Sequence, residues 1–232
     1  MPADAPTRRQ ARFLRHHDED DPGLVGRSLE RQGFDVDVVL VTDETPTVDL
    51  TGVDVLGVLG SKWSVYDHER VGGWIDVELQ TIRRADQCGI AVLGICFGAQ
   101  ALCTAMGGSV SPAARTELGW VALEGVPDEG LPEGPWFEFH SDQCVLPTGA
   151  RVLARNEVCV QAFRIGRHLG VQFHPEIDAA QFARWLEAGA DAEAAADGES
   201  GELLLKEIGA REPDAAARVD RLVAGFLARA DT

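Results

Sequence analysis

The first half of the chain alternates short apolar runs with longer amphipathic segments. Apolar runs of strand length predict buried strands at residues 11–17, 34–41, 53–60 and 90–95. Helical periodicity predicts helices between and after them, at residues 23–33, 67–87 and 98–106. Strands and helices that alternate in this way form right-handed βαβ units. We therefore expect a three-layer α/β fold in which helices flank a mixed, largely parallel sheet.

From about residue 109 the pattern changes to β segments separated by turn residues. These segments predict antiparallel or mixed strands at residues 117–125, 135–146, 151–163 and 168–176. The end of the chain returns to helical patterns, and we interpret residues 1–232 as a single domain with a helical tail at about 178–232.

The tail contains two predicted helices. Residues 178–190 predict a helix with Asp178 as its N-cap, and residues 215–230 predict a helix with one apolar face. The polar stretch between them, residues 191–202, is rich in alanine and glycine, so we expect it to be mobile.

Residues 89–108 carry no charge and have the nominal length of a membrane span. Several glycines interrupt this run, and its first half is rich in Val, Ile and Leu. That composition is typical of a buried parallel strand that leads directly into a packed helix. The sequence therefore predicts a strand and a helix here, and no contact with a membrane.

Composition and charge narrow the class of protein. Apolar residues make up 45% and charged residues 25% of the chain, as in ordinary globular domains. The formal charge of −17 argues against a surface that binds nucleic acid or an anionic membrane. No apolar stretch follows the arginines of MPADAPTRRQ, so no secretory signal is predicted and we expect a cytoplasmic protein. The five cysteines are widely spaced and lack a C-x-x-C pair, which indicates reduced thiols and not a disulfide framework or zinc site.

One of these cysteines, Cys96, follows the predicted strand 90–95, where parallel α/β sheets gather their ligands. Gly94 and Gly98 flank it in the G-x-C-x-G pattern of a nucleophile elbow, a tight strand-to-helix turn that exposes the thiol. The helix that follows favours the thiolate through its N-terminal dipole. The alternative is a small packed core residue, which is what we expect of the other four cysteines.

A cysteine nucleophile needs a proton donor for its leaving group, and the segment VQFHPE at residues 171–176 supplies a candidate. Pro175 keeps His174 extended, and residues i and i+2 of an extended chain point to the same side. Glu176 can therefore accept a hydrogen bond from the ring nitrogen that faces away from sulfur. Cys96, His174 and Glu176 are thus a candidate catalytic triad.

The motifs GICFGAQ, FHSD and VQFHPE, in this order, resemble those of the class I glutamine amidotransferases. The similarity runs from about Leu40 to Glu176 and is closest to stand-alone, GMP-synthase-like members. It implies a flavodoxin-like fold with a seven-stranded mixed sheet. It also implies that Cys96 is the nucleophile, His174 the acid–base and Glu176 the orienting carboxylate.

The resemblance further implies an oxyanion hole and a substrate site. Phe97, which follows the nucleophile, is expected to supply one backbone N–H donor. The segment LGSKWSVYD resembles the family's Gly-Gly-Pro turn, so Ser61 N–H is the expected second donor, although serine departs from the glycine of the pattern. The residues expected to bind substrate are Gly60, Gln100, Ser141 and Asp142.

Together these residues predict hydrolysis of the side-chain amide of glutamine through a cysteinyl thioester, giving glutamate and ammonia. The chain has no P-loop and no pyrophosphatase-like motif, so the ammonia acceptor is expected on a separate synthase subunit. No metal ion or organic cofactor is expected. The alternatives are a hydrolase of γ-glutamyl peptides or amides with the same triad, and a catalytically inactive regulatory subunit.

Three other features complete the prediction. The acidic segment HHDEDD at residues 16–21 is expected to be a solvated loop, with a divalent cation site as the alternative. His140 is expected to support the pocket without taking part in catalysis. Trp63 and Tyr66 are expected either to line the mouth of the pocket or to anchor the loop that carries them.

Overall fold

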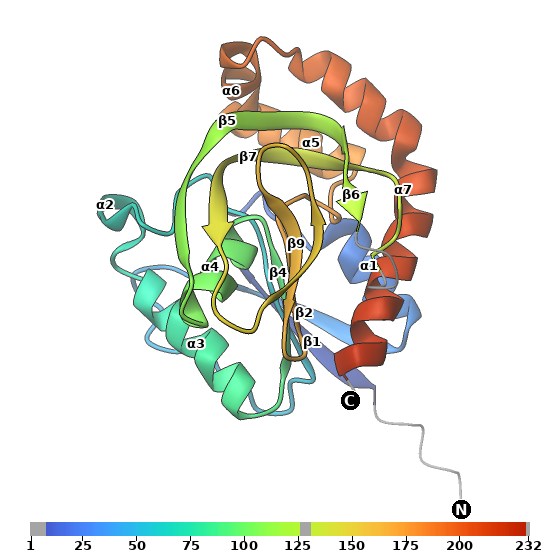
Figure 1. Cartoon of the computed structure of the whole chain (residues 1–232). Helices are drawn as coiled ribbons and strands as arrows, with labels where there is room; N and C mark the ends of the chain where they lie inside the picture. Colours follow the sequence, from blue (N-terminus) through green and yellow to red (C-terminus); the bar gives the residue numbers. More distant parts are fainter. Residues whose placement is uncertain (1–7, 126–130, 231–232) are drawn as a thin grey trace, which may run out of the picture.

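A mixed sheet of eight strands forms the centre of the molecule within the residues that the computed structural model describes, 8–125 and 131–230 (Figure 1). Across the sheet the strands are β2 (Phe34–Leu40), β1 (Arg9–Arg15), β3 (Val55–Val58), β4 (Ala91–Ile95), β10 (His168–Val171), β9 (Val160–Ile165), β8 (Arg151–Arg155) and β6 (Glu124–Gly125). Pairings among the first five strands in this order are parallel, and the last three pairings are antiparallel. The expected mixed, largely parallel sheet is confirmed, and the short edge strand β6 adds an eighth strand to the seven implied by resemblance.

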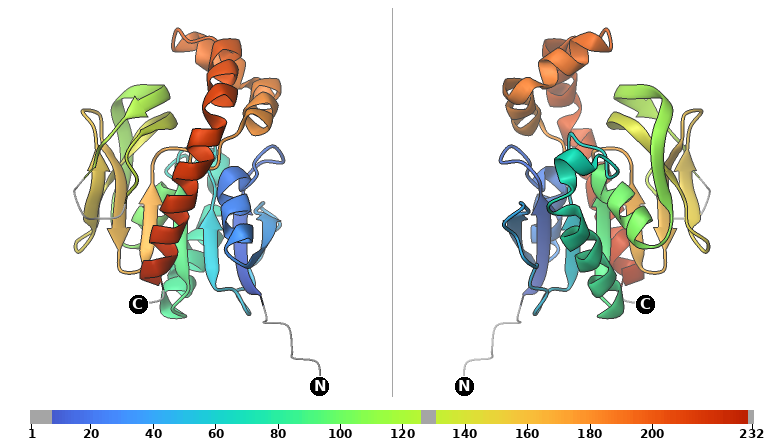
Figure 2. Two further views of the ribbon diagram at one scale, coloured as in Figure 1. Left: turned by 90° about the vertical axis from the view of Figure 1, so that its right-hand side faces the viewer. Right: turned by 90° about the vertical axis from the view of Figure 1, so that its left-hand side faces the viewer.

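A second, two-stranded antiparallel sheet lies beside the β9–β8 end of the main sheet (Figure 2). It consists of β5 (Ser109–Ala122) and β7 (Pro135–Val145). A hydrogen bond of 2.8 Å from the backbone N–H of His174 to the carbonyl of Phe137 ties β7 to the segment after β10. This bond brings the middle of β7 next to the carboxyl end of the parallel strands.

Helices cover both faces of the main sheet, which completes the expected three layers (Figure 2). On one face, α1 (Gly23–Arg31) and α7 (Gly201–Ala230) pack with the inward side chains of β1, β3 and β4 in one hydrophobic cluster. On the other face, α3 (Ile75–Gln87) and α4 (Phe97–Ala105) form a second cluster with the alternate side chains of the same strands. Successive side chains of each buried strand point to opposite faces of the sheet, so each strand contributes to both clusters.

A shorter helical segment lies above the edge where the parallel strands end (Figure 1). It runs through α5 (Ala179–Trp185), a π-helical turn η1 (Leu186–Ala190) and α6 (Asp191–Ala196). Asp178 caps α5, as predicted, by accepting a hydrogen bond of 2.7 Å from the N–H of Gln181. The same carboxylate pairs with Arg27 at 2.8 Å, which joins this segment to α1.

The strand predicted at 117–125 is divided between β6 and β5, which begins earlier, at Ser109, and the strand predicted at 168–176 ends at Val171. Three further departures have a clear physical reason. The helix predicted at 67–87 is divided into α2 (His68–Val71) and α3, because the Gly72–Gly73 pair interrupts it. The segment 151–163 is not one strand but the hairpin β8–β9, since the side chain of Asn156 accepts the N–H groups of Val158 and Cys159 and forms a turn.

The third departure concerns the tail. The stretch 191–202 contains α6 and the start of α7, and α7 continues through Pro213 although proline lacks an N–H donor. Both halves of α7 are packed: Leu204 and Ile208 join a cluster with Phe182 of α5, and its second half covers the sheet. Tertiary packing outweighs the local cost of proline here.

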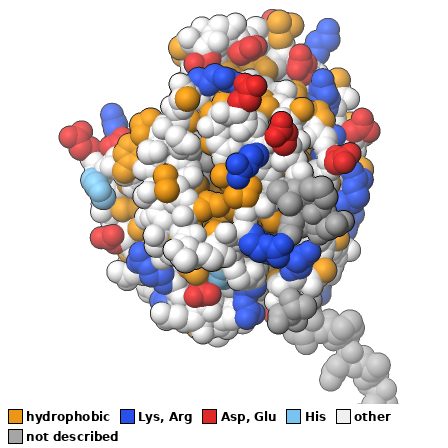
Figure 3. Space-filling view, viewed as in Figure 1, with side chains coloured by type: hydrophobic (Ala, Val, Ile, Leu, Met, Phe, Trp, Pro, Cys, Tyr) orange, Lys and Arg blue, Asp and Glu red, His pale blue; other side chains and the backbone are white. Residues whose placement is uncertain are grey.

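The uncharged run 89–108 divides between β4 and α4, as predicted. In the part of the chain that the structure describes, no helix combines the length and the apolar character needed to cross a membrane. The predicted absence of a secretory signal falls partly on residues 1–7, outside the described residues. On the face seen in Figure 3, acidic and basic side chains are interspersed.

Candidate active site

A pocket of about 200 Å³ opens where the parallel strands end, beneath the α5–α6 segment. The turns after β3, β4 and β10 supply its floor, β7 supplies one wall, and Trp185, Ala188, Ala190 and Glu193 supply part of its roof. Pockets for drug-sized ligands have volumes of roughly 300–1,000 Å³. The smaller volume here suits a substrate the size of an amino acid.

Cys96 lies between β4 and α4 in a strained turn. Its φ of +51° and ψ of −108° make it the one non-glycine residue with positive φ in the described residues. The turn needs both flanking glycines, because a Cβ on Gly94 would lie 2.4 Å from the carbonyl oxygen of Gly98, and one on Gly98 would lie 2.0 Å from that of Val58. Cys96 is 5% exposed and lines the pocket, at the start of the helix where an anion is stabilised.

His174 and Glu176 form a buried pair beside this cysteine. Nδ1 of His174 lies 2.7 Å from Oε1 of Glu176, which leaves Nε2 for Cys96. Burial alone would lower the pKa of His174, but the Glu176 carboxylate and the Cys96 sulfur raise it well above its usual range. The structure thus brings Cys96, His174 and Glu176 together, and their catalytic roles stay a prediction.

Two glutamines lie close to the Cys96 sulfur, one in contact with it and one bonded to the first. Nε2 of Gln172 lies 3.5 Å from Sγ of Cys96, and Oε1 of Gln172 accepts a bond of 3.3 Å from Gln100 of α4. Gln100 lines the pocket, as a substrate-binding role requires, while Gln172 is not among the residues expected from the sequence. A signal for it exists, because Gln172 is two residues before His174 on an extended chain and so faces the same side.

The two expected oxyanion donors belong to different turns of the pocket floor. Ser61 and Gly60 follow β3, and Phe97 begins α4. Among the described residues, neither Ser61 N–H nor Phe97 N–H has a hydrogen-bond partner, so both remain available to a ligand. A Cβ on Gly60 would lie 3.1 Å from Cε1 of His174, so glycine is what allows the imidazole to approach this turn.

The expected substrate-binding segment Ser141–Asp142 forms the β7 wall of the pocket. The Asp142 carboxylate accepts hydrogen bonds from Ser64 at 2.5 Å and from Tyr66 at 2.7 Å. These bonds tie the loop after β3 to β7, so Tyr66 anchors the loop, whereas Trp63 lines the pocket. Ser141 is exposed and its hydroxyl lies 3.1 Å from that of Thr116.

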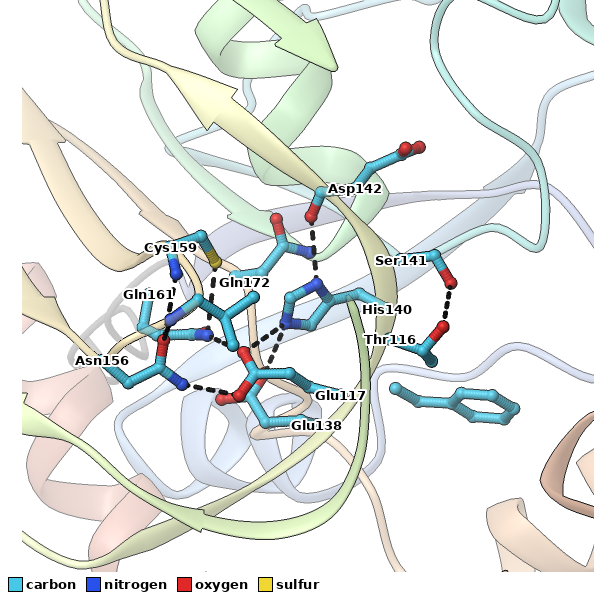
Figure 4. Close-up of polar contacts among 12 residues, drawn as sticks. Thr116, Glu117, Glu138, His140, Ser141, Asp142, Asn156, Cys159, Gln161 and Gln172 are labelled. Atoms are coloured by element: carbon cyan, nitrogen blue, oxygen red, sulfur yellow. Dashed lines mark hydrogen bonds and ion pairs between the residues drawn. The ribbon is translucent and has the colours of Figure 1, made fainter. Parts of the chain in front are cut away.

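His140 lies at the centre of a buried polar cluster between β5, β7 and β9 (Figure 4). Its Nε2 lies 3.3 Å from one oxygen each of Glu117 and Glu138, and its Nδ1 donates to the Asp142 carbonyl at 3.0 Å. Burial would lower the pKa of His140, but the two carboxylates raise it to about 10. The imidazole is therefore protonated at neutral pH and its contacts are structural, which fits the supporting role expected from the sequence.

The same cluster contains the residues best placed to hold a metal ion. Ligand atoms of Glu117, His140 and Cys159 lie within 4.8 Å of one another, and all three residues are buried. However, amide groups of Asn156 and Gln161 already donate to Glu117, at 2.7 and 2.6 Å. Burial also raises the pKa of Cys159 to about 12, which keeps it a thiol. Both oxygens of Glu117 thus accept hydrogen bonds from amide groups and Cys159 stays protonated, so we assign no metal to this cluster.

The acidic segment at residues 16–21 is not a wholly solvated loop, and that prediction is wrong for two of its residues. His16 is 6% exposed, and Asp20 is 8% exposed and lines the pocket. Burial raises the pKa of Asp20 to about 6. A run of charges suggests exposure, but His16 packs against Trp74 and Phe97, and Arg184 of α5 donates to the Glu19 carbonyl. Of the cysteines expected to pack, Cys88 is exposed and the other three are buried.

A ring contact closes the pocket from above. Trp185, at the end of α5, meets the ring of His174 edge-to-face with ring centres 5.1 Å apart. The contact limits the access of water to the imidazole from that side. The helix predicted over 178–190 contains this tryptophan, but no local signal links it to His174.

Comparisons with known proteins identify the family of this chain. The family model for class-I glutamine amidotransferases matches residues 24–190. The glutamine-hydrolysing GMP synthase of Thermomicrobium roseum is 42% identical over 99 residues, which cover 39% of this chain and 19% of that protein. One subunit of the glutamine-hydrolysing GMP synthase of Sulfurisphaera tokodaii is 34% identical over 165 residues, which cover 66% of this chain and 82% of that subunit.

A solved structure gives the same picture for the fold. The crystal structure of a glutamine amidotransferase from Thermotoga maritima has a TM-score of 0.83 and 26% identity, and the match covers 94% of this chain and 97% of that one. The chain matches about a fifth of the length of the T. roseum protein but most of the S. tokodaii subunit. The chain belongs to the class-I glutamine amidotransferase family.

Proposed function

We propose that this protein hydrolyses the side-chain amide of glutamine through a thioester on Cys96. The Cys96 thiolate attacks the carboxamide carbon, and the N–H groups of Ser61 and Phe97 stabilise the negative charge that forms on its oxygen. His174 donates a proton to the nitrogen, the C–N bond breaks, and ammonia leaves. His174 then takes a proton from water as the water oxygen attacks the thioester. Glutamate leaves and the Cys96 thiolate is restored.

The strained turn at Cys96, with the His174–Glu176 pair beside it, is the observation that carries this proposal. A non-glycine residue in this conformation costs about 1–3 kcal/mol, so the fold must hold it there for a reason. The turn presents sulfur to the pocket at a helix start, next to an imidazole whose orientation Glu176 fixes. Membership in the class-I glutamine amidotransferase family supports glutamine as the substrate.

We also propose that Gln100 and the Ser141–Asp142 segment hold the substrate glutamine. All three residues line the pocket, together with Gly60. The small volume of the pocket agrees with an amino acid as ligand.

The ammonia is proposed to pass to an acceptor on a separate synthase subunit. The S. tokodaii relative is described as one subunit of a GMP synthase, and the match covers 82% of its length. Helices α6 and α7 lie beyond the matched family region 24–190, and Glu193 of α6 lines the pocket. Part of the pocket roof therefore lies outside the family match.

A direct test supplies the purified protein with glutamine and with a panel of γ-glutamyl amides and peptides. The expected result is glutamate and ammonia from glutamine, and none from the Cys96→Ala variant. Turnover of the γ-glutamyl compounds alone would contradict the proposal and favour a γ-glutamyl hydrolase. A folded protein that turns over neither, and whose Cys96 is not labelled by a glutamine-like electrophile, would be a regulatory subunit.

A further inference from the structure

A second buried imidazole–carboxylate pair lies behind the pocket wall. Nε2 of His16, just after β1, lies 2.7 Å from Oε2 of Glu78 on α3, and both side chains are fully buried. The ring stacks on Trp74 with ring centres 4.7 Å apart and meets the ring of Phe97 at 4.8 Å. His16 is not among the described residues that line the pocket, so any effect of His16 on a substrate must pass through its neighbours.

The second nitrogen of His16 faces the oxyanion turn. Nδ1 lies 2.8 Å from the carbonyl oxygen of Gly60. A carbonyl oxygen only accepts hydrogen bonds, so Nδ1 carries a hydrogen. This is true whether the proton between Nε2 and Glu78 resides on the ring or on the carboxyl group. Every protonation state compatible with both contacts therefore donates to Gly60.

That hydrogen bond fixes the direction of the Ser61 N–H. The Gly60 carbonyl and the Ser61 N–H belong to one planar trans peptide, so they point in opposite directions. With the oxygen held by His16, which does not line the pocket, the N–H is directed to the other side of the turn. Gly60 and Ser61 themselves line the pocket, and no described residue accepts a hydrogen bond from this N–H.

We propose that His16, oriented by Glu78, positions and polarises the Gly60–Ser61 peptide so that Ser61 N–H serves as an oxyanion donor. The inference rests on the proposed function of the same site. A peptide next to glycine flips at low cost, and a flip would present the Gly60 oxygen, an acceptor, to the developing negative charge. The flip would break the bond to His16, so this bond favours the donor orientation. A donor on the carbonyl also strengthens the N–H of the same peptide.

His16 also contacts the other expected donor residue through the Phe97 ring. One buried side chain therefore touches both halves of the expected oxyanion hole. Glu78 keeps the imidazole in place, much as Glu176 keeps His174 in place. His16 and Glu78 are thus positioning residues, and neither contacts the reacting atoms.

A matched pair of variants tests the proposal. The amide nitrogen of asparagine takes the place of Nδ1, and that of glutamine takes the place of Nε2. His16→Asn therefore keeps the donor to Gly60, and His16→Gln keeps the contact to Glu78 but loses that donor. Glutamine hydrolysis is measured for both, with thermal unfolding as the check that each variant is folded. Alkylation of Cys96 by iodoacetamide, followed at the peptide level, reports the thiolate in a reaction that forms no oxyanion.

We expect kcat of His16→Gln to be about 10- to 100-fold lower than that of the wild type, and its KM to stay within about threefold of the wild-type value. The loss of a whole oxyanion donor costs about 10²–10³ in kcat, which sets this scale. His16→Asn is expected to retain most of kcat, and the alkylation rate of Cys96 is expected to stay within about twofold in both.

Folded His16→Gln with unchanged kcat would overturn the inference. So would parallel losses of kcat and of Cys96 alkylation, or equal losses of kcat in both variants. A wild-type protein that is alkylated at Cys96 but hydrolyses no amide would instead contradict the proposed function, and this inference with it.

Discussion

His174 and His140 lie in the wall of the same pocket, both buried and both held by carboxylates, but they differ in what their nitrogens meet. His174 gives one nitrogen to Glu176 and keeps the other for Cys96. His140 gives Nδ1 to the Asp142 carbonyl and Nε2 to both Glu117 and Glu138. One imidazole keeps a nitrogen beside the Cys96 sulfur, and the other uses both nitrogens in structural contacts.

The two histidines also differ in whether the proposed reaction changes the charges around them. The pKa of His140 is raised to about 10 by two carboxylates that the proposed reaction never alters. Part of the increase in the pKa of His174 comes from the Cys96 sulfur, which the proposed reaction converts into a neutral thioester. The proton affinity of His174 therefore falls during the step in which its proton must leave. A buried histidine suits acid–base work when the reaction itself consumes its countercharge.

The largest expected effect comes from removing the sulfur on which this difference depends. Cys96→Ala and Cys96→Gly are both expected to lower kcat/KM for glutamine by roughly 10⁴-fold or more, because no nucleophile remains. The two variants should differ in stability, since glycine adopts the positive φ of this turn without strain. We expect Cys96→Gly to be more stable than Cys96→Ala by about 1 kcal/mol in urea unfolding. Equal stability would mean that the turn relaxes when sulfur is absent.

The next largest effects separate the acid–base from its orienting carboxylate. His174→Ala removes the proton donor and acceptor, and Glu176→Ala removes only the group that fixes the ring. We expect both to lower kcat, with the loss in Glu176→Ala smaller by about tenfold or more. Steady-state glutaminase assays on folded variants measure this, with Cys96 alkylation as a second readout. An equal or greater loss in Glu176→Ala would show that the carboxylate does more than orient the imidazole.

The fold and the candidate triad residues can be predicted from the sequence because their signals are local. The alternation of apolar runs and helices predicts the sheet, and the spacing of Gly94 and Gly98 around Cys96 predicts the turn that the structure contains. The i and i+2 relation predicts that Glu176 faces His174, and the 2.7 Å contact agrees. The same relation could have identified Gln172. The catalytic roles of these residues remain predictions.

Contacts between distant parts of the chain have no local signal. His16 and Glu78 are 62 residues apart, and a histidine within a run of acidic residues is expected to be exposed until α3 is seen to pack against it. The clusters that bury both halves of α7 likewise depend on α5 and the sheet, so the sequence predicts this helix only from residue 215, after Pro213. Contacts of this kind form only when distant segments pack together, so short-range patterns in a single sequence do not predict them.

His140 provides the next prediction, which concerns stability more than turnover. Its folded pKa of about 10 lies above the ordinary value of 6.5. A raised pKa means that the stabilising contribution is complete below pH 6.5 and is lost as the pH rises towards 10. We expect His140→Gln to lower the free energy of unfolding by about 3–5 kcal/mol at about pH 6, because two buried carboxylates lose their cation.

The pH dependence is the readout that a simple packing defect would not produce. Urea unfolding of the wild type and of His140→Gln, measured from about pH 6 to about pH 9, should show a difference that shrinks as the pH rises. A difference that is constant with pH would mean that the imidazole is neutral in the folded protein. His140 would then be a hydrogen-bonding residue, and its contrast with His174 would not rest on permanent charge.

The smallest expected effect concerns the side-chain anchor of the same β7 segment. Tyr66 is 43% exposed, and its hydroxyl shares the Asp142 carboxylate with Ser64. Tyr66→Phe removes one of the two hydroxyl donors to the Asp142 carboxylate and leaves the other in place, so we expect KM for glutamine to rise about two- to fivefold while kcat stays within about twofold. Ser64→Ala is the matched variant, and its side chain is the less exposed of the two, so its KM should rise further. Unchanged KM in both would mean that the bond from His140 to the Asp142 carbonyl holds this wall of the pocket without help from the loop after β3.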